Sequence, residues 1–184
     1  MKQLAIIIFL ITSLYSHEAN CTDMFAMIFD KNMTDENTAK CIEYYIDELG
    51  CDTNIVPSFA NDGSNLLDAA YENNKTKTFD LLLNKGITPD KWLTAIIATE
   101  FLVFFRENSD GIKDKKASPE LLEFIKTPKY NEFKEEKFKL IKKLLDHGQD
   151  PKDYILLQKV LTLVNDEKDL ENLLKDGAKK ELAQ

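Results

Sequence analysis

The sequence predicts an all-α fold, a solenoid of about four short helical repeats. The 184-residue chain is 43% hydrophobic and 30% charged, with few glycines and prolines, and its length suits one domain with a sizeable core. The main observation is one helix ending, an amphipathic run closed by a glycine, that recurs at Gly50, Gly86, Gly148 and Gly177.

The spacing of these glycines predicts the repeat. They lie 36, 62 and 29 residues apart. Periods near 33 residues are typical of stacked helical pairs, and the wide gap predicts that the third repeat carries an insertion, at about 107–131. Each repeat cannot bury its apolar face alone, so it needs a neighbour that covers it.

Hydrophobic periodicity and end signals place the helices along the chain. The expected ranges are 22–30, 36–49, 65–73, 76–85, 91–106, 119–126, 132–147, 152–164 and 167–176. The fifth is the most apolar, and we expect it to be covered on most sides, with Trp92 and Phe101 among its packed residues. The insertion should open with a polar loop. Ser118-Pro119 then begins a short helix, which Thr127-Pro128 ends.

The first sixteen residues have the pattern of a secretory signal. One lysine, an apolar run from Leu4 to Leu14 and the small residue Ser16 form the three parts of such a peptide. The run is short for a membrane span. We therefore expect residues 1–16 to be removed, residues 17–184 to form the repeat domain, and the protein to be exported, either periplasmic or secreted, without membrane insertion after cleavage.

Export bears on the three cysteines, because an oxidising compartment permits a disulfide. Helices 22–30 and 36–49 are joined by a short link and should form an antiparallel hairpin, which brings the start of the first beside the end of the second. This arrangement predicts a Cys21–Cys51 bridge and leaves Cys41 unpaired.

Residues 62–90, "DGSNLLDAAYENNKTKTFDLLLNKGITPD", resemble an ankyrin repeat. Gly63 takes the opening turn and Ala70 lies in the alanine pair of that family. Asn74-Lys75 takes the turn between helices, Leu81-Leu82-Leu83 the leucine run, and Gly86-Ile87-Thr88-Pro89-Asp90 the ending. Asn65-Leu66-Leu67-Asp68 stands where the family has Thr-Pro-Leu-His. The resemblance is looser over the rest of residues 22–180.

The resemblance implies a protein-binding role, with finger loops after each repeat ending as the binding face. The expected partner-binding residues are Ile55, Val56, Phe59, Asp62, Asp90, Lys91, Asp150 and Asp153. Apolar anchors ringed by charge suit a protein interface. Two alternatives remain. Aspartate is common in such loops for its turn-forming chemistry alone, and the 107–131 insertion is another candidate for the binding face.

Charge and motifs narrow the function further. A net charge of −8 disfavours nucleic acid and suits a basic protein partner. The sequence contains no catalytic, phosphate-binding or zinc motif, and His147 lies just before Gly148, where it can contact the last carbonyls of a helix. We therefore expect no enzyme activity, metal or cofactor. The expected function is an exported protein-binding module, such as a periplasmic inhibitor or immunity protein against a secreted toxin. Alternatives are a secreted factor that binds a host protein and an enzyme with an unrecognised site.

Overall fold

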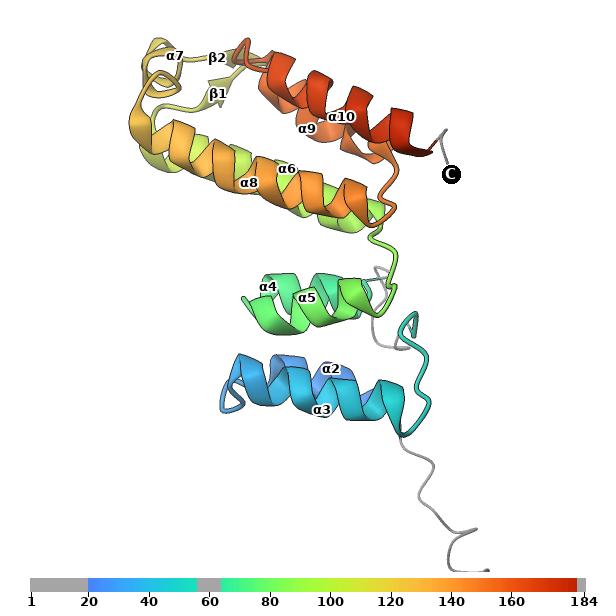
Figure 1. Ribbon diagram of the computed structural model, residues 1–184. Coiled ribbons are helices and arrows are strands. Elements are labelled where there is room, and N and C mark those ends of the chain that lie inside the picture. The colour runs from blue at the N-terminus through green and yellow to red at the C-terminus, as the bar shows by residue number, and fades with distance from the viewer. Residues whose placement is uncertain (1–19, 56–63, 182–184) are drawn as a thin grey trace, which may run out of the picture. The chain divides into compact units, whose positions relative to one another are not determined.

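The computed structural model describes residues 20–55 and 64–181, with the side chains of 179–181 left out, so the expected signal peptide and the segment 56–63 lie outside it (Figure 1). The described chain is helical apart from one two-stranded hairpin, which confirms the predicted all-α class. It forms two compact units, Met1–Ile87 and Thr88–Gln184.

The first unit contains two helical hairpins. One is formed by α2 (Asp23–Phe29) and α3 (Asp35–Asp47), the other by α4 (Leu66–Glu72) and α5 (Thr76–Asn84). Helix α2 packs against α4, and α3 packs against α5 (Figure 1). The buried apolar core of this unit includes Met24, Phe25, Ile28, Ile42, Leu66, Leu67, Ala70, Phe79, Leu82 and Leu83.

Local side-chain chemistry sets the ends of these helices. Thr34 caps α3 by accepting a hydrogen bond from the amide of Asn37 at 3.3 Å. Asn65 and Asp68 form a capping box at α4, in the position where the ankyrin pattern would place a threonine and a histidine. Gly86 has a φ of +87° with open space around it, so the left-handed backbone conformation is what requires glycine there.

Lys75 joins the two hairpins of the first unit. Its side chain is only 8% exposed. The ammonium group donates to the carbonyl of Met33 in the α2–α3 connection, to that of Asp30 at 3.4 Å, and to the hydroxyl of Thr38 at 3.3 Å. A lysine in the turn of one hairpin therefore binds the turn of the other.

The second unit contains the longer helices α6 (Lys91–Asn108), α8 (Pro128–Asp146) and α10 (Lys168–Glu181), and the shorter α7 (Pro119–Phe124), η1 (Pro151–Tyr154) and α9 (Ile155–Thr162). Helix α6 packs against α9, and α8 against α10. Aromatic rings join α6 to α8: Phe133 stacks on Phe104 with ring centroids 3.9 Å apart and meets Phe101 edge-on at 5.0 Å.

Two features of the insertion differ from the sequence-based expectation. The expected polar loop contains a β-hairpin of β1 (Ile112–Lys113) and β2 (Lys116–Ala117), whose turn residues Asp114 and Lys115 have φ values of +50° and +61°. Thr127 caps α8 and Pro128 is its first residue, so α8 begins at 128 rather than 132. Pro128, which the sequence pattern placed at the end of one helix, is the first residue of the next helix.

Gly177 does not end a helix, contrary to the prediction, because α10 continues through it to Glu181. A Cβ atom at Gly177 would lie 3.3 Å from two methyl carbons of Leu145 in α8. Glycine therefore permits close packing of α10 on α8. The other three glycines of the repeated ending have positive φ values, as that ending requires.

Candidate interaction surface

The structure places the predicted partner-binding residues in two separate groups. Asp90, Lys91, Asp150 and Asp153 belong to the second unit, and Ile55 is a half-buried residue of the first. Val56, Phe59 and Asp62 lie outside the described residues. The loops of the second unit do come together, because the hydroxyl of Thr94 in α6 donates to the carbonyl of Asp153 in η1 at 2.9 Å.

The aspartates of this group serve local structure. Asp90 caps α6 by accepting from the amide of Trp92 at 2.8 Å, and Asp150 caps η1 by accepting from the amide of Lys152 at 2.8 Å. Asp153 accepts from the side-chain amide of the buried Gln149 at 2.6 Å. Asp90 and Asp150 therefore have the local turn role that was the alternative explanation for these aspartates, whereas Asp153 bonds a side chain.

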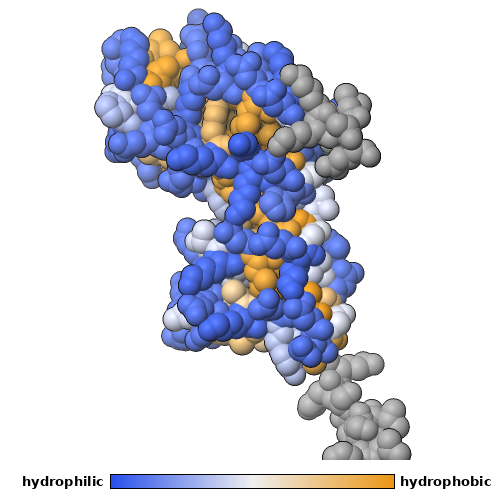
Figure 2. All heavy atoms as spheres, in the orientation of Figure 1, coloured by the Kyte–Doolittle hydropathy of each residue, from blue (hydrophilic) through white to orange (hydrophobic). Residues whose placement is uncertain are grey.

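Exposed apolar side chains offer a second guide to a binding surface, and most of them were missed by sequence reasoning. Figure 2 shows a largely hydrophilic surface with scattered apolar patches on the face in view. Among the described residues, the exposed large hydrophobic side chains are those of Phe29, Tyr44, Leu49, Trp92, Leu102, Ile155 and Leu156. Trp92 was expected to pack in a covered helix, yet it is 38% exposed. Positions 92, 99 and 106 are seven residues apart and therefore lie on the same side of a helix. Two of them are the polar residues Thr99 and Arg106, and this was the signal in the sequence that the side is exposed.

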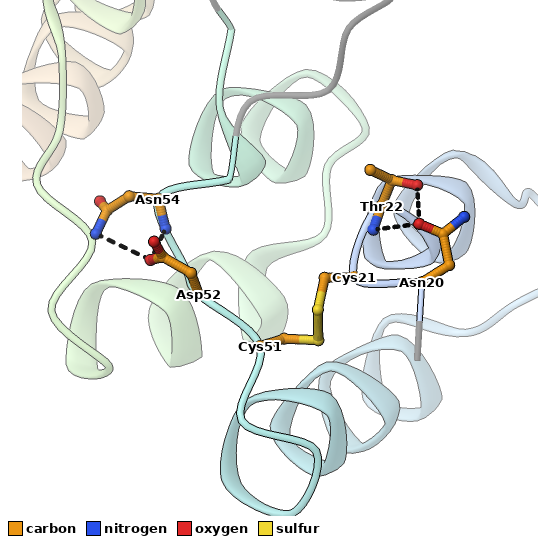
Figure 3. Close-up of a disulfide and its surroundings, with 6 residues drawn as sticks. All are labelled: Asn20, Cys21, Thr22, Cys51, Asp52 and Asn54. Carbon is orange, nitrogen blue, oxygen red and sulfur yellow. Dashed lines mark hydrogen bonds between the residues drawn. A yellow bond between two sulfur atoms is a disulfide. The ribbon is translucent and has the colours of Figure 1, made fainter. Parts of the chain in front are cut away.

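The disulfide lies where the sequence predicts it (Figure 3). Cys21 precedes α2, Cys51 follows α3, and a bridge joins them with their Cα atoms 5.5 Å apart. Each cysteine is flanked by a side chain that bonds the backbone two residues on: Asn20 accepts from the amide of Thr22, and Asp52 from that of Asn54. Cys41 is a free, partly exposed thiol. The bridge therefore closes the first hairpin at its open end.

Acidic side chains are concentrated in the first unit. Residues 17–87 contain 13 acidic and 5 basic side chains, a net charge of −8, whereas residues 88–184 contain 19 and 18, a net charge of −1. Some of the acids are paired: Glu36 binds Lys40 and Lys77 at 2.9 Å each, and hydrogen bonds from these lysines lower the pKa of Glu36 to about 2. Glu43 and Tyr44 are exposed on α3, and Glu48, the residue that follows this helix, is exposed as well.

A polar cluster of the second unit joins α8 to the start of α10. Tyr130 donates to Asp166 at 2.5 Å, and Lys134 binds both Asp166 and Asp169 at 2.8 Å. Burial and the bond to Asp166 raise the pKa of Tyr130. Burial alone would lower the pKa of Lys134, but its bonds to Asp166 and Asp169 outweigh burial and raise it. Both groups thus keep their protons, and the cluster acts as a cross-link between elements.

Other features bear on the predicted chemistry. Within residues 20–55 and 64–181, no group of three or more His, Cys, Asp or Glu side chains is arranged to hold a metal. No helix in that part of the chain is long and apolar enough to cross a bilayer. His147 contacts the carbonyl of Lys143 through Nδ1 at 2.8 Å, near the end of α8, as its position before Gly148 predicts.

Comparison with known proteins adds no relative to this description: no family model, curated protein or solved structure matches the chain.

Proposed function

We propose that the protein is an exported, non-catalytic protein-binding module built from about four ankyrin-like repeats. The observation that carries this proposal is the packing of the first unit, where α2 lies on α4 and α3 lies on α5. Equivalent helices of successive repeats pack in this way in a repeat array. The bond network of Lys75, which ties the turns of the two hairpins together, supports the same interpretation.

The second unit fits the later repeats of the proposed array. Its four main helices pair in the same order, α6 with α9 and α8 with α10. The β-hairpin and α7 lie between α6 and α8, where the insertion of a third repeat belongs. Helix α10 would be the last outer helix, and close packing at Gly177 replaces the expected glycine ending.

Export is supported by the amino-terminal signal pattern together with the Cys21–Cys51 bridge, since disulfides persist in oxidising compartments. The concrete role that we propose is a periplasmic inhibitor or immunity protein that neutralises a secreted toxin or enzyme. Its partner would be a basic protein, because the first unit concentrates the negative charge of the chain and exposes Phe29 and Tyr44 on its surface. The finger loops are proposed to contribute through Ile55, Val56, Phe59 and Asp62.

Affinity capture with charge-reversed variants tests this function. The oxidised chain without its signal, residues 17–184, is immobilised and exposed to periplasmic and secreted proteins. We expect one basic protein to be retained and to be eluted by salt. The amount of protein retained should fall at least tenfold when Glu43→Lys is combined with Glu48→Lys. The matched control combines Glu132→Lys with Glu135→Lys, which are exposed on α8 of the second unit, and it should retain as much protein as the parent. Equal retention by both pairs would refute the basic-partner proposal.

A further inference from the structure

Three asparagines of the first unit lie in the sequence pattern of an N-glycosylation acceptor, Asn-x-Ser/Thr with any residue but proline at x. The chain contains this pattern at Asn20-Cys21-Thr22, Asn32-Met33-Thr34 and Asn74-Lys75-Thr76. An acidic residue also stands two positions before each asparagine: Glu18, Asp30 and Glu72. We propose that the three asparagines are acceptors for a periplasmic oligosaccharyltransferase. The inference rests on the proposed function only in requiring export into that compartment.

The acidic residues point to a bacterial enzyme. Transferases of the eukaryotic secretory pathway need only the asparagine and the hydroxyl residue. Several bacterial transferases also require a carboxylate two positions before the asparagine, which suits a charge-assisted bond to a cationic group of the enzyme. Asp and Glu occupy 32 of the 184 positions, so a carboxylate before all three asparagines is not expected by chance. Asn37 and Asn54 have such a carboxylate but lack the hydroxyl residue, which makes them internal controls.

The structure presents two of the acceptors in the turns of the helical hairpins. Asn32 lies in the α2–α3 turn, and Asn74 lies in the α4–α5 turn with a φ of +55°, which asparagine tolerates. Both residues are exposed, and so are the acidic residue and the threonine of each pattern. Neither side-chain amide is hydrogen-bonded to another described residue. A glycan on either nitrogen therefore displaces no packed group.

The third acceptor lies beside the disulfide (Figure 3). Asn20 is exposed, and its Oδ1 atom accepts from the hydroxyl of Thr22 at 2.6 Å. The two functional side chains of this pattern therefore face each other. Because these bonds use only the oxygen of the amide, its nitrogen is left for the sugar.

Transfer has to precede the final packing of these segments. Lys75, which follows Asn74, is buried against the α2–α3 connection, and Cys21, which follows Asn20, is bridged to Cys51. The signal pattern of residues 1–16 predicts export, and a chain that passes through a secretion channel is not yet folded. The transferase would meet the acceptors at that stage. The folded chain then accommodates the sugars, since all three asparagines are exposed.

The reaction requires one co-reactant, an oligosaccharide joined to a membrane lipid through pyrophosphate. The Nδ2 atom of asparagine attacks the anomeric carbon of the first sugar. A bond forms between this nitrogen and the carbon, while the bond from the carbon to the pyrophosphate oxygen breaks. The lipid pyrophosphate leaves with the electron pair, and the nitrogen gives up one of its two protons to the surrounding base or water. Nothing is oxidised or reduced.

Intact-mass spectrometry tests the inference on the chain purified from the periplasm of the cells that produce it. We expect one, two or three copies of a single glycan above the mass of residues 17–184, and none in a matched strain whose oligosaccharyltransferase is inactive. Peptide mapping identifies the modified positions. It should find the glycan on Asn20, Asn32 and Asn74, and never on Asn37 or Asn54.

Two kinds of variant separate the acceptor nitrogen from the acidic residue. Asn32→Asp and Asn74→Asp remove the nitrogen but keep a side chain that suits a turn, and each should remove one glycan. Asp30→Asn and Glu72→Gln keep the shape of the side chain without its charge, and each should lower glycan occupancy at its own site at least tenfold. Asp30→Glu, which keeps the carboxylate, should still be modified. Thermal unfolding checks that each variant folds.

Three results would overturn the inference. They are an exported chain with the mass of the bare polypeptide, a glycan on the control asparagines, or unchanged occupancy in Asp30→Asn and Glu72→Gln, which would show that the transferase ignores the carboxylate. A chain that stays in the cytoplasm with residues 1–16 attached would refute both this inference and the proposed export. An exported chain that captures its partner without any glycan leaves the proposed function standing, and a glycosylated chain that captures nothing leaves only the acceptor sites.

Discussion

Asp35 of α3 caps a helix of the neighbouring hairpin through Thr78. One carboxylate oxygen of Asp35 accepts from both the amide and the hydroxyl of Thr78, at 3.0 and 2.9 Å, and the other accepts from the amide of Lys77 at 2.7 Å. The N-cap residue of α5, Lys75, supplies no side-chain cap of its own. A residue 43 positions away therefore satisfies the free amides at the start of α5.

Replacement of this cap should destabilise the first unit. We expect Asp35→Ala to lower the free energy of unfolding by about 1–2 kcal/mol, as loss of a helix cap usually does. Urea unfolding measures the change, with the exposed Glu48→Gln as a control that should have little effect. A variant as stable as the parent would show that the bonds to Thr78 and Lys77 contribute nothing.

The same cap predicts how stability responds to acid. Burial alone would raise the pKa of Asp35, but hydrogen bonds from Lys77 and Thr78 outweigh burial and lower it below its usual value of 3.8. A lowered pKa in the folded state stabilises the fold above pH 3.8, and this contribution is lost as the pH falls through the folded-state pKa. The stability difference between parent and Asp35→Ala should therefore shrink below pH 4. A difference that stays constant down to pH 2 would contradict this.

The Cys21–Cys51 bridge should stabilise the first hairpin. It spans 30 residues, and restriction of the unfolded chain by a loop of this size stabilises by about 2–4 kcal/mol. Cys21→Ser with Cys51→Ser should lower the melting temperature, while Cys41→Ser leaves it nearly unchanged. Peptide mapping without reduction checks the pairing, and a bridge that contains Cys41 would refute it.

Gly86 and Gly177 should respond in opposite ways to alanine. Gly86 has a φ of +87°, which strains any L side chain, so Gly86→Ala should cost about 1 kcal/mol or more. Gly177 is helical, and its tight contacts, at 3.3 Å, would be with the two methyl carbons of Leu145, while the Leu145 Cβ lies at 3.6 Å. Because these methyl groups can move aside, the higher helix propensity of alanine should make Gly177→Ala neutral or slightly stabilising. Thermal unfolding compares the two. A larger loss at Gly177 would mean that Leu145 cannot move aside.

Two buried tyrosines make a matched comparison in the second unit. Tyr130 donates to Asp166, whereas the buried hydroxyl of Tyr154 has no hydrogen-bond partner among the described residues. Tyr130→Phe should therefore lower the free energy of unfolding by about 1–2 kcal/mol, and Tyr154→Phe should leave it unchanged or raise it.

The two tyrosines also predict how stability responds to alkali. Burial raises the pKa of both phenols, so the stabilisation that they provide in the protonated form is fully present below pH 10 and should fall above it. Each replacement should reduce that alkaline loss. Equal effects of the two variants on stability at pH 7 would contradict the assignment.

Local signals made most of the helix pattern predictable. Caps and glycine turns bond the backbone within a few residues, so the sequence alone locates the helix ends that they form. Examples are Ser118-Pro119, Asn65 with Asp68, and the glycines at 50, 86 and 148. The disulfide followed from the same information, because a short link between two helices already implies which ends meet.

Contacts between distant residues could not be predicted in this way. Gly177 matched the repeated ending, but its role depends on Leu145 in another helix. Trp92 fitted a covered apolar helix. Thr99 and Arg106 hinted at an exposed side, but the packing of α6 on α9 and its ring contacts with α8 were needed to show that Trp92 lies on that side. The binding residues were placed by resemblance to finger loops. Their local bonds became visible only in the structure, where Asp90 and Asp150 cap helices and Asp153 bonds the side chain of Gln149.

Isothermal titration calorimetry with the purified captured protein tests the central claim most directly. The oxidised chain of residues 17–184 is titrated with that protein at low and at physiological salt. The account predicts saturable binding at a fixed stoichiometry, a negative heat-capacity change from apolar burial, weaker affinity at the higher salt, and a partner recovered chemically unchanged. Absence of any binding heat, or conversion of the partner into a product, would contradict a non-catalytic protein-binding module.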